Sequence, residues 1–274
     1  MATDKIELSA CYSIFNEEDW IQYSIESVYD CVERIVIAWG PWKCNLEVPP
    51  DNTRRIIKNL DDPDKKILLL EGQYNSEHEQ RNACLNYVKS GYYFLVDADE
   101  IYDKKVMMRM KKTIEKHPEV YVFKIPSLIF WRNFDTIIEG EFNFPRVFKV
   151  LPEASFTWLN MMSLGGTEYE VLGQYIFNGS KIFNFHFAYA KSDKAMYEKI
   201  RACIEREDGT THIIVRNWYE KVWIGWKTDP VSAFQLYGGV HPVDPPAFSS
   251  FRKRTETLPE CLKKHPYNGL GLVE

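Results

Sequence analysis

Short apolar runs alternate with amphipathic segments through the first hundred residues of the chain. These runs are rich in strand-forming residues and span residues 6–15, 34–39, 66–70 and 92–96. After the first run, Asn16 suits a helix N-cap, and Ile21, Ile25 and Val28 then recur at helical spacing. Four strands separated by helices predict a mostly parallel sheet, which binds ligands outside the carboxyl ends of its strands.

Helix signals continue after the second strand. Asp51 can cap a short helix to residue 60, and Ser76 with Glu79 forms a capping box for a helix to about residue 89. Further elements are expected as helices at residues 103–117 and 192–207 and as strands at residues 120–131, 146–150 and 181–187. The sequence therefore predicts one α/β domain over residues 1–207, with an irregular extension, residues 208–274, packed on it.

Composition narrows the class of protein. The chain has 274 residues, of which 45% are hydrophobic, so it can form a large α/β core and is neither disordered nor fibrous. Its formal net charge of -5 provides no global basic field for nucleic acid or anionic lipid. The six cysteines include no C-x-x-C pair, and no apolar run suits a signal peptide or a membrane span. We expect a soluble cytoplasmic protein with reduced thiols.

The fourth strand runs directly into Asp97-Ala98-Asp99-Glu100. Residues two apart in an extended segment point to the same side, so Asp97 and Asp99 are expected to present their carboxylates together. Mg²⁺ and Mn²⁺ bind a few carboxylate oxygens and fill their other positions with water or phosphate. A bare D-x-D is also common as a solvated acidic turn, but its place after an apolar strand favours a divalent-cation site.

Three segments resemble the family 2 type of glycosyltransferase with the GT-A fold. They are residues 13–18 (SIFNEE), residues 79–82 (EQRN) leading to residues 95–100 (LVDADE), and residues 186–189 (HFAY). The resemblance implies a nucleotide-sugar-binding half over residues 1–103 and an acceptor half over residues 104–207. It also implies transfer of a sugar from a nucleoside-diphosphate sugar to an acceptor hydroxyl, although the acceptor itself is not indicated.

The same resemblance assigns residues to the donor. It implies that Asn16, Glu17 and Asp97 lie on the donor side and that Arg81 lies near the diphosphate, whose oxygens a guanidinium can bind. Plainer alternatives stay open, because Asn16 and Glu17 also suit a helix start and Arg81 can pair with Glu77 on a helix surface.

For the metal, the resemblance implies a shell of Asp97, Asp99 and His186 around Mn²⁺ or Mg²⁺. In it, Asp99 is the direct ligand and Asp97 the donor-side or bridging partner. Without the resemblance, a single strand histidine such as His186 is more often a hydrogen-bonded core residue.

One departure from the family concerns the loop after the second strand. Family members commonly carry an aspartate there that contacts the nucleotide, whereas this chain has Ala38-Trp39-Gly40-Pro41-Trp42. We therefore expect Trp39 or Trp42 to pack near the base, with burial of both rings in the core as the alternative.

An inverting transfer needs a carboxylate that accepts the proton of the acceptor hydroxyl. Such a base should lie between the D-x-D and the late histidine, where the candidates are Asp135, Glu139, Glu141, Glu168 and Glu170. We choose Glu168, which follows the Gly165-Gly166 turn. A retaining enzyme would need no such base.

Two other functions compete with this prediction. A sugar-phosphate nucleotidyltransferase also uses an α/β sheet with paired carboxylates, but it normally has a glycine-rich basic loop where this chain has the acidic Phe15-Asn16-Glu17-Glu18. A non-catalytic carbohydrate-binding protein would use the abundant aromatic residues as its binding surface.

Overall fold

The computed structural model describes residues 6–43, 46–158, 160–204, 217–229 and 250–271. Contacts divide the chain into two compact units that alternate along the sequence. The first unit comprises Met1–Ser127, Phe142–His186 and Pro259–Lys263, and the second comprises Leu128–Glu141, Phe187–Leu258 and Lys264–Glu274. A division of the chain at residues 103 and 207 stays a prediction, and much of the predicted extension 208–274 lies outside the described residues.

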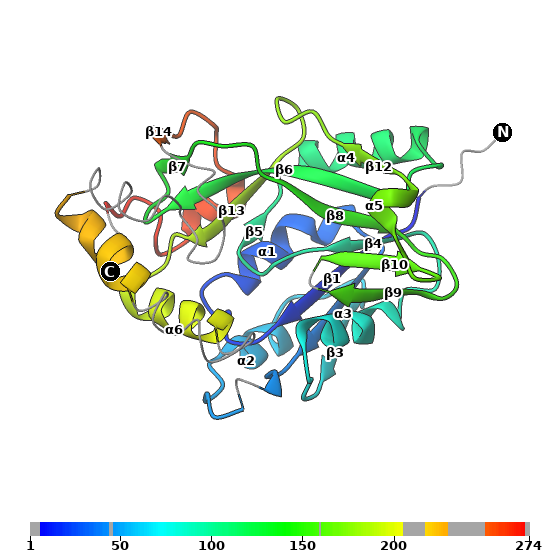
Figure 1. The fold of residues 1–274 in the computed structure, drawn as a ribbon, viewed down its shortest axis with the longest axis horizontal. Coiled ribbons are helices and arrows are strands. Elements are labelled where there is room, and N and C mark those ends of the chain that lie inside the picture. Colours follow the sequence, from blue (N-terminus) through cyan, green and yellow to red (C-terminus); the bar gives the residue numbers. More distant parts are fainter. Residues whose placement is uncertain (1–5, 44–45, 159, 205–216, 230–249, 272–274) are drawn as a thin grey trace. The chain divides into compact units, whose positions relative to one another are not determined.

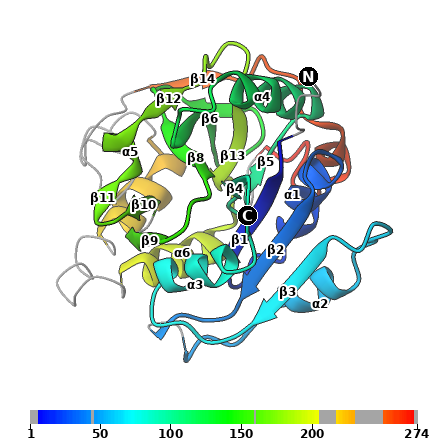
Figure 2. The same cartoon turned by 90° about the vertical axis from the view of Figure 1, so that its right-hand side faces the viewer.

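The first unit is built on a sheet whose four N-terminal strands are parallel (Figures 1 and 2). In spatial order they are β4 (Tyr92–Leu95), β1 (Leu8–Ile14), β2 (Arg34–Trp39) and β3 (Ile67–Glu71). Beyond β4, the sheet continues with two antiparallel strands, β8 (Asn143–Lys149) and the first part of β6 (Val122–Trp131), after which β12 (Gln174–Ile176) pairs parallel with β6. The predicted α/β class with a mostly parallel sheet flanked by helices is confirmed.

Helices cover both faces of the parallel strands, because alternate residues of each strand point to opposite sides. Leu8, Ala10 and Tyr12 of β1 belong to one core cluster with the buried residues of α1 (Ile21–Val28), whereas Cys11 belongs to a second cluster with Cys84 of α3 (Glu77–Leu85). Figure 2 shows α1 and α3 on opposite sides of the sheet.

The remaining elements of the first unit surround this sheet. They are the helices α2 (Thr53–Lys58), α4 (Lys104–Lys116) and α5 (Tyr169–Leu172), the 3-10 turn Tyr29–Cys31, the short strand β5 (Glu100–Ile101), and a separate sheet of β9 (Ala154–Trp158), β10 (Met161–Leu164) and β11 (Thr167–Glu168). The strand β13 (Asn184–Tyr189) begins in this unit, where His186 pairs with Glu100 of β5.

The second unit begins with the last part of β6. Phe130 pairs with Ile137 of β7 (Thr136–Ile138), and β7 pairs with β14 (Phe251–Lys253). Its helical segments are α6 (Asp193–Ile204), the π-helical turn Tyr219–Ile224 and the 3-10 turn Gly225–Lys227, and the 3-10 helix Glu260–Lys264 ends in it. At its centre, the buried guanidinium of Arg132 lies 3.8 Å from the ring centroid of Trp223 and 3.0 Å from Asp193.

The predicted start of α1 is wrong. The helix begins at Ile21, and Asn16 instead adopts a left-handed backbone with φ of 59° in the preceding loop. The structure also ends α3 at Leu85 rather than near residue 89, and it starts β13 at Asn184, three residues later than residue 181.

Within the part of the chain that the structure describes, no helix combines the length and the apolar composition needed to cross a bilayer.

Candidate active site

The carboxyl ends of β1, β2 and β4 lie at one edge of the sheet, because these neighbouring strands are parallel. Chain segments with polar residues follow all three strands at this edge, and the D-x-D segment follows β4. The sequence-based expectation that this edge carries the site therefore has a structural basis.

Gln80 of α3 connects two of these strand ends. Its fully buried side-chain amide donates to the carbonyl oxygens of Ile14 at 3.1 Å, Ala38 at 2.8 Å and Gly40 at 3.3 Å. Its Oε1 accepts a hydrogen bond of 2.7 Å from Nε1 of Trp42. The sequence analysis missed this residue, whose only signal was an amide on the helix face that must meet the sheet.

Asn16 and Glu17 shape the loop after β1. The Asn16 side chain accepts from the amide of Asp51 at 2.9 Å and donates to the carbonyl of Pro49 at 3.0 Å. The amide of Glu17 donates to Oγ1 of Thr53 at 2.7 Å. These contacts join the loop to the segment before α2, and their predicted role toward the donor stays a prediction.

The D-x-D segment is a turn and does not continue the strand. β4 ends at Leu95, and the amide of Glu100 donates to the carbonyl of Asp97 at 3.0 Å. The extended geometry expected for Asp97 and Asp99 is therefore wrong, since a turn does not place alternate side chains on one side. Ser24 of α1 holds the turn through a 2.8 Å hydrogen bond to the carbonyl of Glu100.

A buried arginine, Arg146 of β8, joins Asp97 to Glu100. Its Nη2 lies 2.7 Å from Oδ2 of Asp97 and 2.8 Å from Oε1 of Glu100, and its Nε lies 3.0 and 3.1 Å from the two Glu100 oxygens. Tyr102 donates its hydroxyl to Oε2 of Glu100 at 2.9 Å. Both carboxylate oxygens of Glu100 thus accept charge-assisted or neutral hydrogen bonds inside the fold.

The charges around Asp97 decide its protonation. Burial alone raises the pKa of Asp97, but the charges of Arg146, Arg81 and His186 outweigh this and hold that pKa below its ordinary value. Burial lowers the pKa of Arg146, whereas Asp97, Glu100 and Tyr102 raise it more strongly. Asp97 is therefore a carboxylate near neutral pH, and its arginine partner is a cation.

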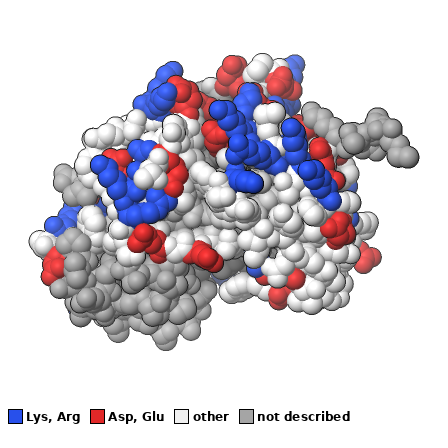
Figure 3. Space-filling model, turned by 90° about the horizontal axis from the view of Figure 1, so that it is seen from above, with Lys and Arg blue, Asp and Glu red and all other residues white. Residues whose placement is uncertain are grey.

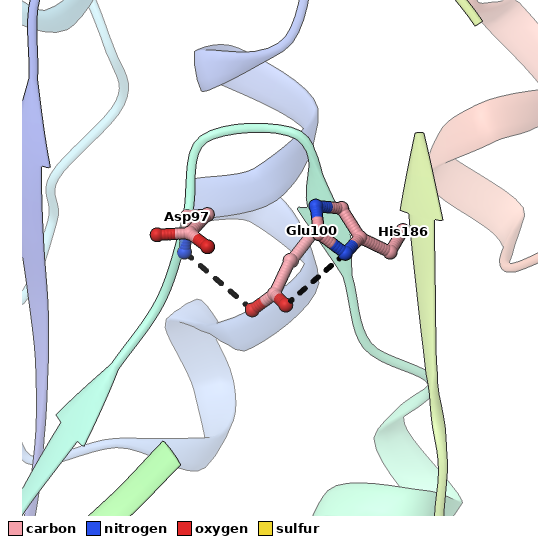
Figure 4. Close-up of side chains that lie close together, drawn as sticks. All are labelled: Asp97, Glu100 and His186. Atoms are coloured by element: carbon pink, nitrogen blue, oxygen red, sulfur yellow. Dashed lines mark hydrogen bonds and ion pairs between the residues drawn. The ribbon is translucent and has the colours of Figure 1, made fainter. Parts of the chain in front are cut away.

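His186 lies between two carboxylates. Its Nε2 is 3.3 Å from Oδ1 of Asp99, and its Nδ1 is 3.8 Å from Oε1 of Glu100. Figure 4 shows Glu100 reaching from β5 toward both Asp97 and His186 of β13. The ligand atoms of Asp97, Glu100 and His186 lie within 4.8 Å of one another, so these three form a possible metal-binding group.

Glu100, one of the two carboxylates beside His186, is already held by other side chains. Glu100 uses both of its oxygens for Arg146 and Tyr102, and at 3.8 Å its Oε1 is too far from Nδ1 of His186 for a hydrogen bond. Asp99 and His186 are nearly inaccessible, with 6% and 11% of their side chains exposed. A metal shell of Asp97, Asp99 and His186 stays a prediction.

Comparison with known proteins identifies the family. The model for glycosyl transferase family 2 matches residues 9–158, which is more than half of the chain. The chain belongs to this family. It is a glycosyltransferase.

Solved structures resemble this glycosyltransferase only distantly, at 11–12% identity. S. aureus TarS 1-349 in complex with UDP is 12% identical, with 84% of this chain and 75% of that chain covered and a TM-score of 0.39. The same protein in complex with UDP-GlcNAc gives 12% identity, coverage of 84% and 76%, and a TM-score of 0.39. The bifunctional IspDF from Campylobacter jejuni is 11% identical, with 63% of this chain and 50% of that chain covered and a TM-score of 0.37. No curated protein matches the chain.

Arg81 of the glycosyltransferase lies beside the D-x-D turn. Its guanidinium is buried, pairs with the carboxylate of Glu77, bonds to the side chain of Asn160, and lies 4.0 Å from Oδ1 of Asp97. The helical pair with Glu77 and the proximity to the D-x-D thus occur together, and a contact with diphosphate stays a prediction.

Trp39 and Trp42 occupy the loop after β2 of the transferase. The half-buried ring of Trp39 lies 6.1 Å from the ring of Phe15 and 5.9 Å from the guanidinium carbon of Arg54, measured to ring centroids. Trp42 is held by its hydrogen bond to Gln80. Their stacking on a base stays a prediction.

Glu168, the chosen base of the glycosyltransferase, lies in the separate three-stranded sheet. It is exposed on β11 and pairs with Ser163 of β10. Among the described residues, no hydrogen bond or ion pair connects Glu168 with Asp97, Asp99 or His186. Its role as the base stays a prediction.

Sequence analysis missed Glu100 and Arg146 as members of the site. Arg146 is a charged residue directly before the apolar Val147 and Phe148 in one strand, and Glu100 directly precedes Ile101 in another strand. A charge in a buried strand needs a partner, and this was the available signal.

Proposed function

We propose that this glycosyltransferase uses Mn²⁺ or Mg²⁺ to transfer a sugar, with inversion, from a nucleoside-diphosphate sugar to an acceptor hydroxyl. The observation that supports the metal is the buried pair of Asp99 Oδ1 and His186 Nε2, 3.3 Å apart. Two adjacent ligands at about 2.1 Å from one ion lie about 3 Å apart, so this pair fits such an ion.

In this proposal, Asp99 and His186 hold the ion, and the carboxylate of Glu100 lies 3.8 Å from Nδ1 of that imidazole. A bound divalent ion would neutralise charge on the departing nucleoside diphosphate. Asp97 lies on the donor side, fixed by Arg146, and the guanidinium of Arg81 provides donors for phosphate oxygens. Trp39 is proposed to pack against the base, with Asn16 and Glu17 shaping that pocket.

For the proton of the acceptor we propose Glu168. Its support is its exposure next to Gly165 and Gly166, where the space that a side chain of either residue would fill is open. Glu168→Gln should then reduce turnover while leaving donor binding unchanged. NMR analysis of the product anomer tests inversion, and retention would contradict both the stereochemistry and the base.

The central test measures donor binding and chemistry separately. Purified protein is screened by thermal shift with Mn²⁺ and UDP-, GDP- or dTDP-sugars, because a ligand of the folded state raises the melting temperature. Asp99→Asn and His186→Ala should each weaken Mn²⁺ binding, which electron paramagnetic resonance measures. Each should also reduce turnover by at least about 100-fold.

Asp61→Asn is the matched control, because Asp61 is exposed and this substitution removes the same charge as Asp99→Asn. It should leave binding and turnover unchanged. Release of free sugar and nucleoside diphosphate supports the proposal. Release of pyrophosphate would point instead to a nucleotidyltransferase, and full activity of Asp99→Asn would refute the metal site.

A further inference from the structure

A row of cations lies along the outer face of α4. The buried side of this helix consists of Val106, Met107, Met110 and Ile114. On the opposite side, Lys105, Arg109, Lys112 and Lys116 are all exposed. At 100° per residue these four fall within an arc of about 60°, and at 1.5 Å per residue the row is about 16 Å long. Figure 3 shows basic side chains gathered on this face of the molecule.

The row lacks neutralising partners, although its neighbours have them. On the flank of α4, Lys104 pairs with Asp30 at 2.8 Å and Lys111 with Glu33 at 2.9 Å. Among the described residues, no carboxylate forms an ion pair with any of the four outer cations. Within the described part of the chain, the one side-chain hydrogen bond of these four residues runs from Arg109 to the carbonyl of Lys181 at 3.4 Å, and Lys181 is itself exposed and basic.

Folding gives no reason for this arrangement. Like charges three or four residues apart destabilise a helix by about 0.2–0.5 kcal/mol per pair. The first turn of α4 carries Lys104 and Lys105 and no acid, although cations are unfavourable beside the positive end of the helix dipole. The protein as a whole is acidic, with a net charge of -5, so the row is also not a general property of its surface.

We infer that the row binds a linear anionic polymer, such as a phosphate-bearing glycan, and that this polymer is the acceptor class of the proposed transferase. The row is straight, and α4 begins at its cap Asp103, four residues beyond Asp99. Lys105, the first cation of the row, follows Asp99 by six residues, so one end of a bound polymer would lie within about 20 Å of the D-x-D turn. This inference rests on the proposed function.

The composition of α4 favours a polymer over a bilayer. Helices that lie in a membrane surface insert apolar or aromatic side chains between the lipids. All apolar residues of α4 face the core except Met108, which is 53% exposed. The outer face thus offers electrostatic attraction with almost nothing to insert.

The test uses the whole protein and fluorescently labelled linear polyphosphate, with binding followed by anisotropy over a series of salt concentrations. Each phosphate contact contributes about 0.7–0.9 to the slope of log affinity against log salt. The variant Lys105→Gln/Arg109→Gln/Lys112→Gln should reduce that slope by about 2 and weaken binding at low salt by at least about 10-fold.

The matched control is Arg55→Gln/Lys65→Gln/Lys89→Gln, which removes three exposed cations outside α4. It should retain most of the affinity. Equal losses in both variants would overturn the inference, because they would reflect net charge alone. Absence of salt-dependent polyphosphate binding would overturn the inference as well. If the protein then floated with phosphatidylglycerol vesicles but not with phosphatidylcholine vesicles, the row would bind an anionic membrane instead of a polymer.

Donor hydrolysis separates this inference from the proposed function. Neither triple variant changes the residues that hold the donor, so both should hydrolyse the sugar nucleotide like the unmodified protein. Lost polyphosphate binding with unchanged hydrolysis supports the row. Absent hydrolysis in the unmodified protein would refute the proposed function, and with it the assignment of the polymer as acceptor.

Discussion

Arg146 is predicted to stabilise the fold and to position Asp97, and these two effects can be separated. Arg146→Met keeps the apolar stem but leaves the charge of the fully buried Glu100 with the Tyr102 hydroxyl, a weak backbone contact and Nδ1 of His186 at 3.8 Å. Breaking a buried ion pair from one side costs about 3–5 kcal/mol. For a chain of this size, that cost lowers the melting temperature by about 10 °C.

A second substitution then removes the stranded charge. In Glu100→Gln/Arg146→Met both members of the pair are neutral, and such replacements cost far less than a broken pair. Most of the lost melting temperature should therefore return. Asp97, however, still lacks its 2.7 Å partner. A charge-assisted hydrogen bond contributes about 1.5–3 kcal/mol, so donor affinity by calorimetry should stay about 10- to 100-fold below that of the unmodified protein.

Met110→Ala is the stability control for this experiment. Met110 is fully buried in the core under α4, and its truncation costs about 2–5 kcal/mol without removing a hydrogen bond or ion pair of the D-x-D turn. It should lower the melting temperature as Arg146→Met does and leave donor affinity unchanged. The reasoning is refuted if the double variant binds donor normally, or if Arg146→Met melts like the unmodified protein.

Two further predictions concern residues that support the site and the sheet. Gln80→Leu removes the donor shared by the carbonyls of Ile14, Ala38 and Gly40, and should cost about 1–3 kcal/mol in a denaturant titration; an unchanged midpoint would contradict this. Burial raises the pKa of Asp62, but hydrogen bonds from Tyr29 and two backbone amides outweigh burial, so the folded pKa is below its ordinary value. The stabilisation by Asp62 is therefore present above its unfolded pKa of about 3.9 and is lost as pH falls through the lower folded pKa. The melting-temperature difference between the unmodified protein and Asp62→Asn should accordingly shrink in acid, and a constant difference would refute the assignment.

The strands could be predicted because their signal is local. The run Arg34–Trp39 is short, apolar and β-branched, and β2 has those bounds. The helix start could not be predicted in the same way, because Asn16 satisfies its amide with Pro49 and Asp51, more than thirty residues away. A local cap and a distant loop compete for the same side chain, and only the folded chain decides between them.

The capping box of α3 shows the same limit at shorter range. Oγ of Ser76 accepts from the amide of Glu79 at 3.3 Å, as the pattern predicts. The carboxylate of Glu79 reaches past Ser76, however, and accepts from the backbone and side-chain nitrogens of Asn75 at 2.6 and 2.8 Å. The residue types predict that a helix begins here. Which amide the Glu79 carboxylate binds depends on the path of the residues before Ser76.

The D-x-D illustrates why a motif can be located from sequence while its chemistry needs the fold. Asp97 and Asp99 are identical residues two positions apart, and a strand would have placed both on one face. The turn instead directs Asp97 to a buried arginine from β8 and Asp99 to a histidine from β13. Their partners come from 49 and 87 residues further along the chain, so no local pattern could distinguish the two. Glu100 contacts both partners, so the residue just outside the motif links the arginine beside Asp97 to the histidine beside Asp99.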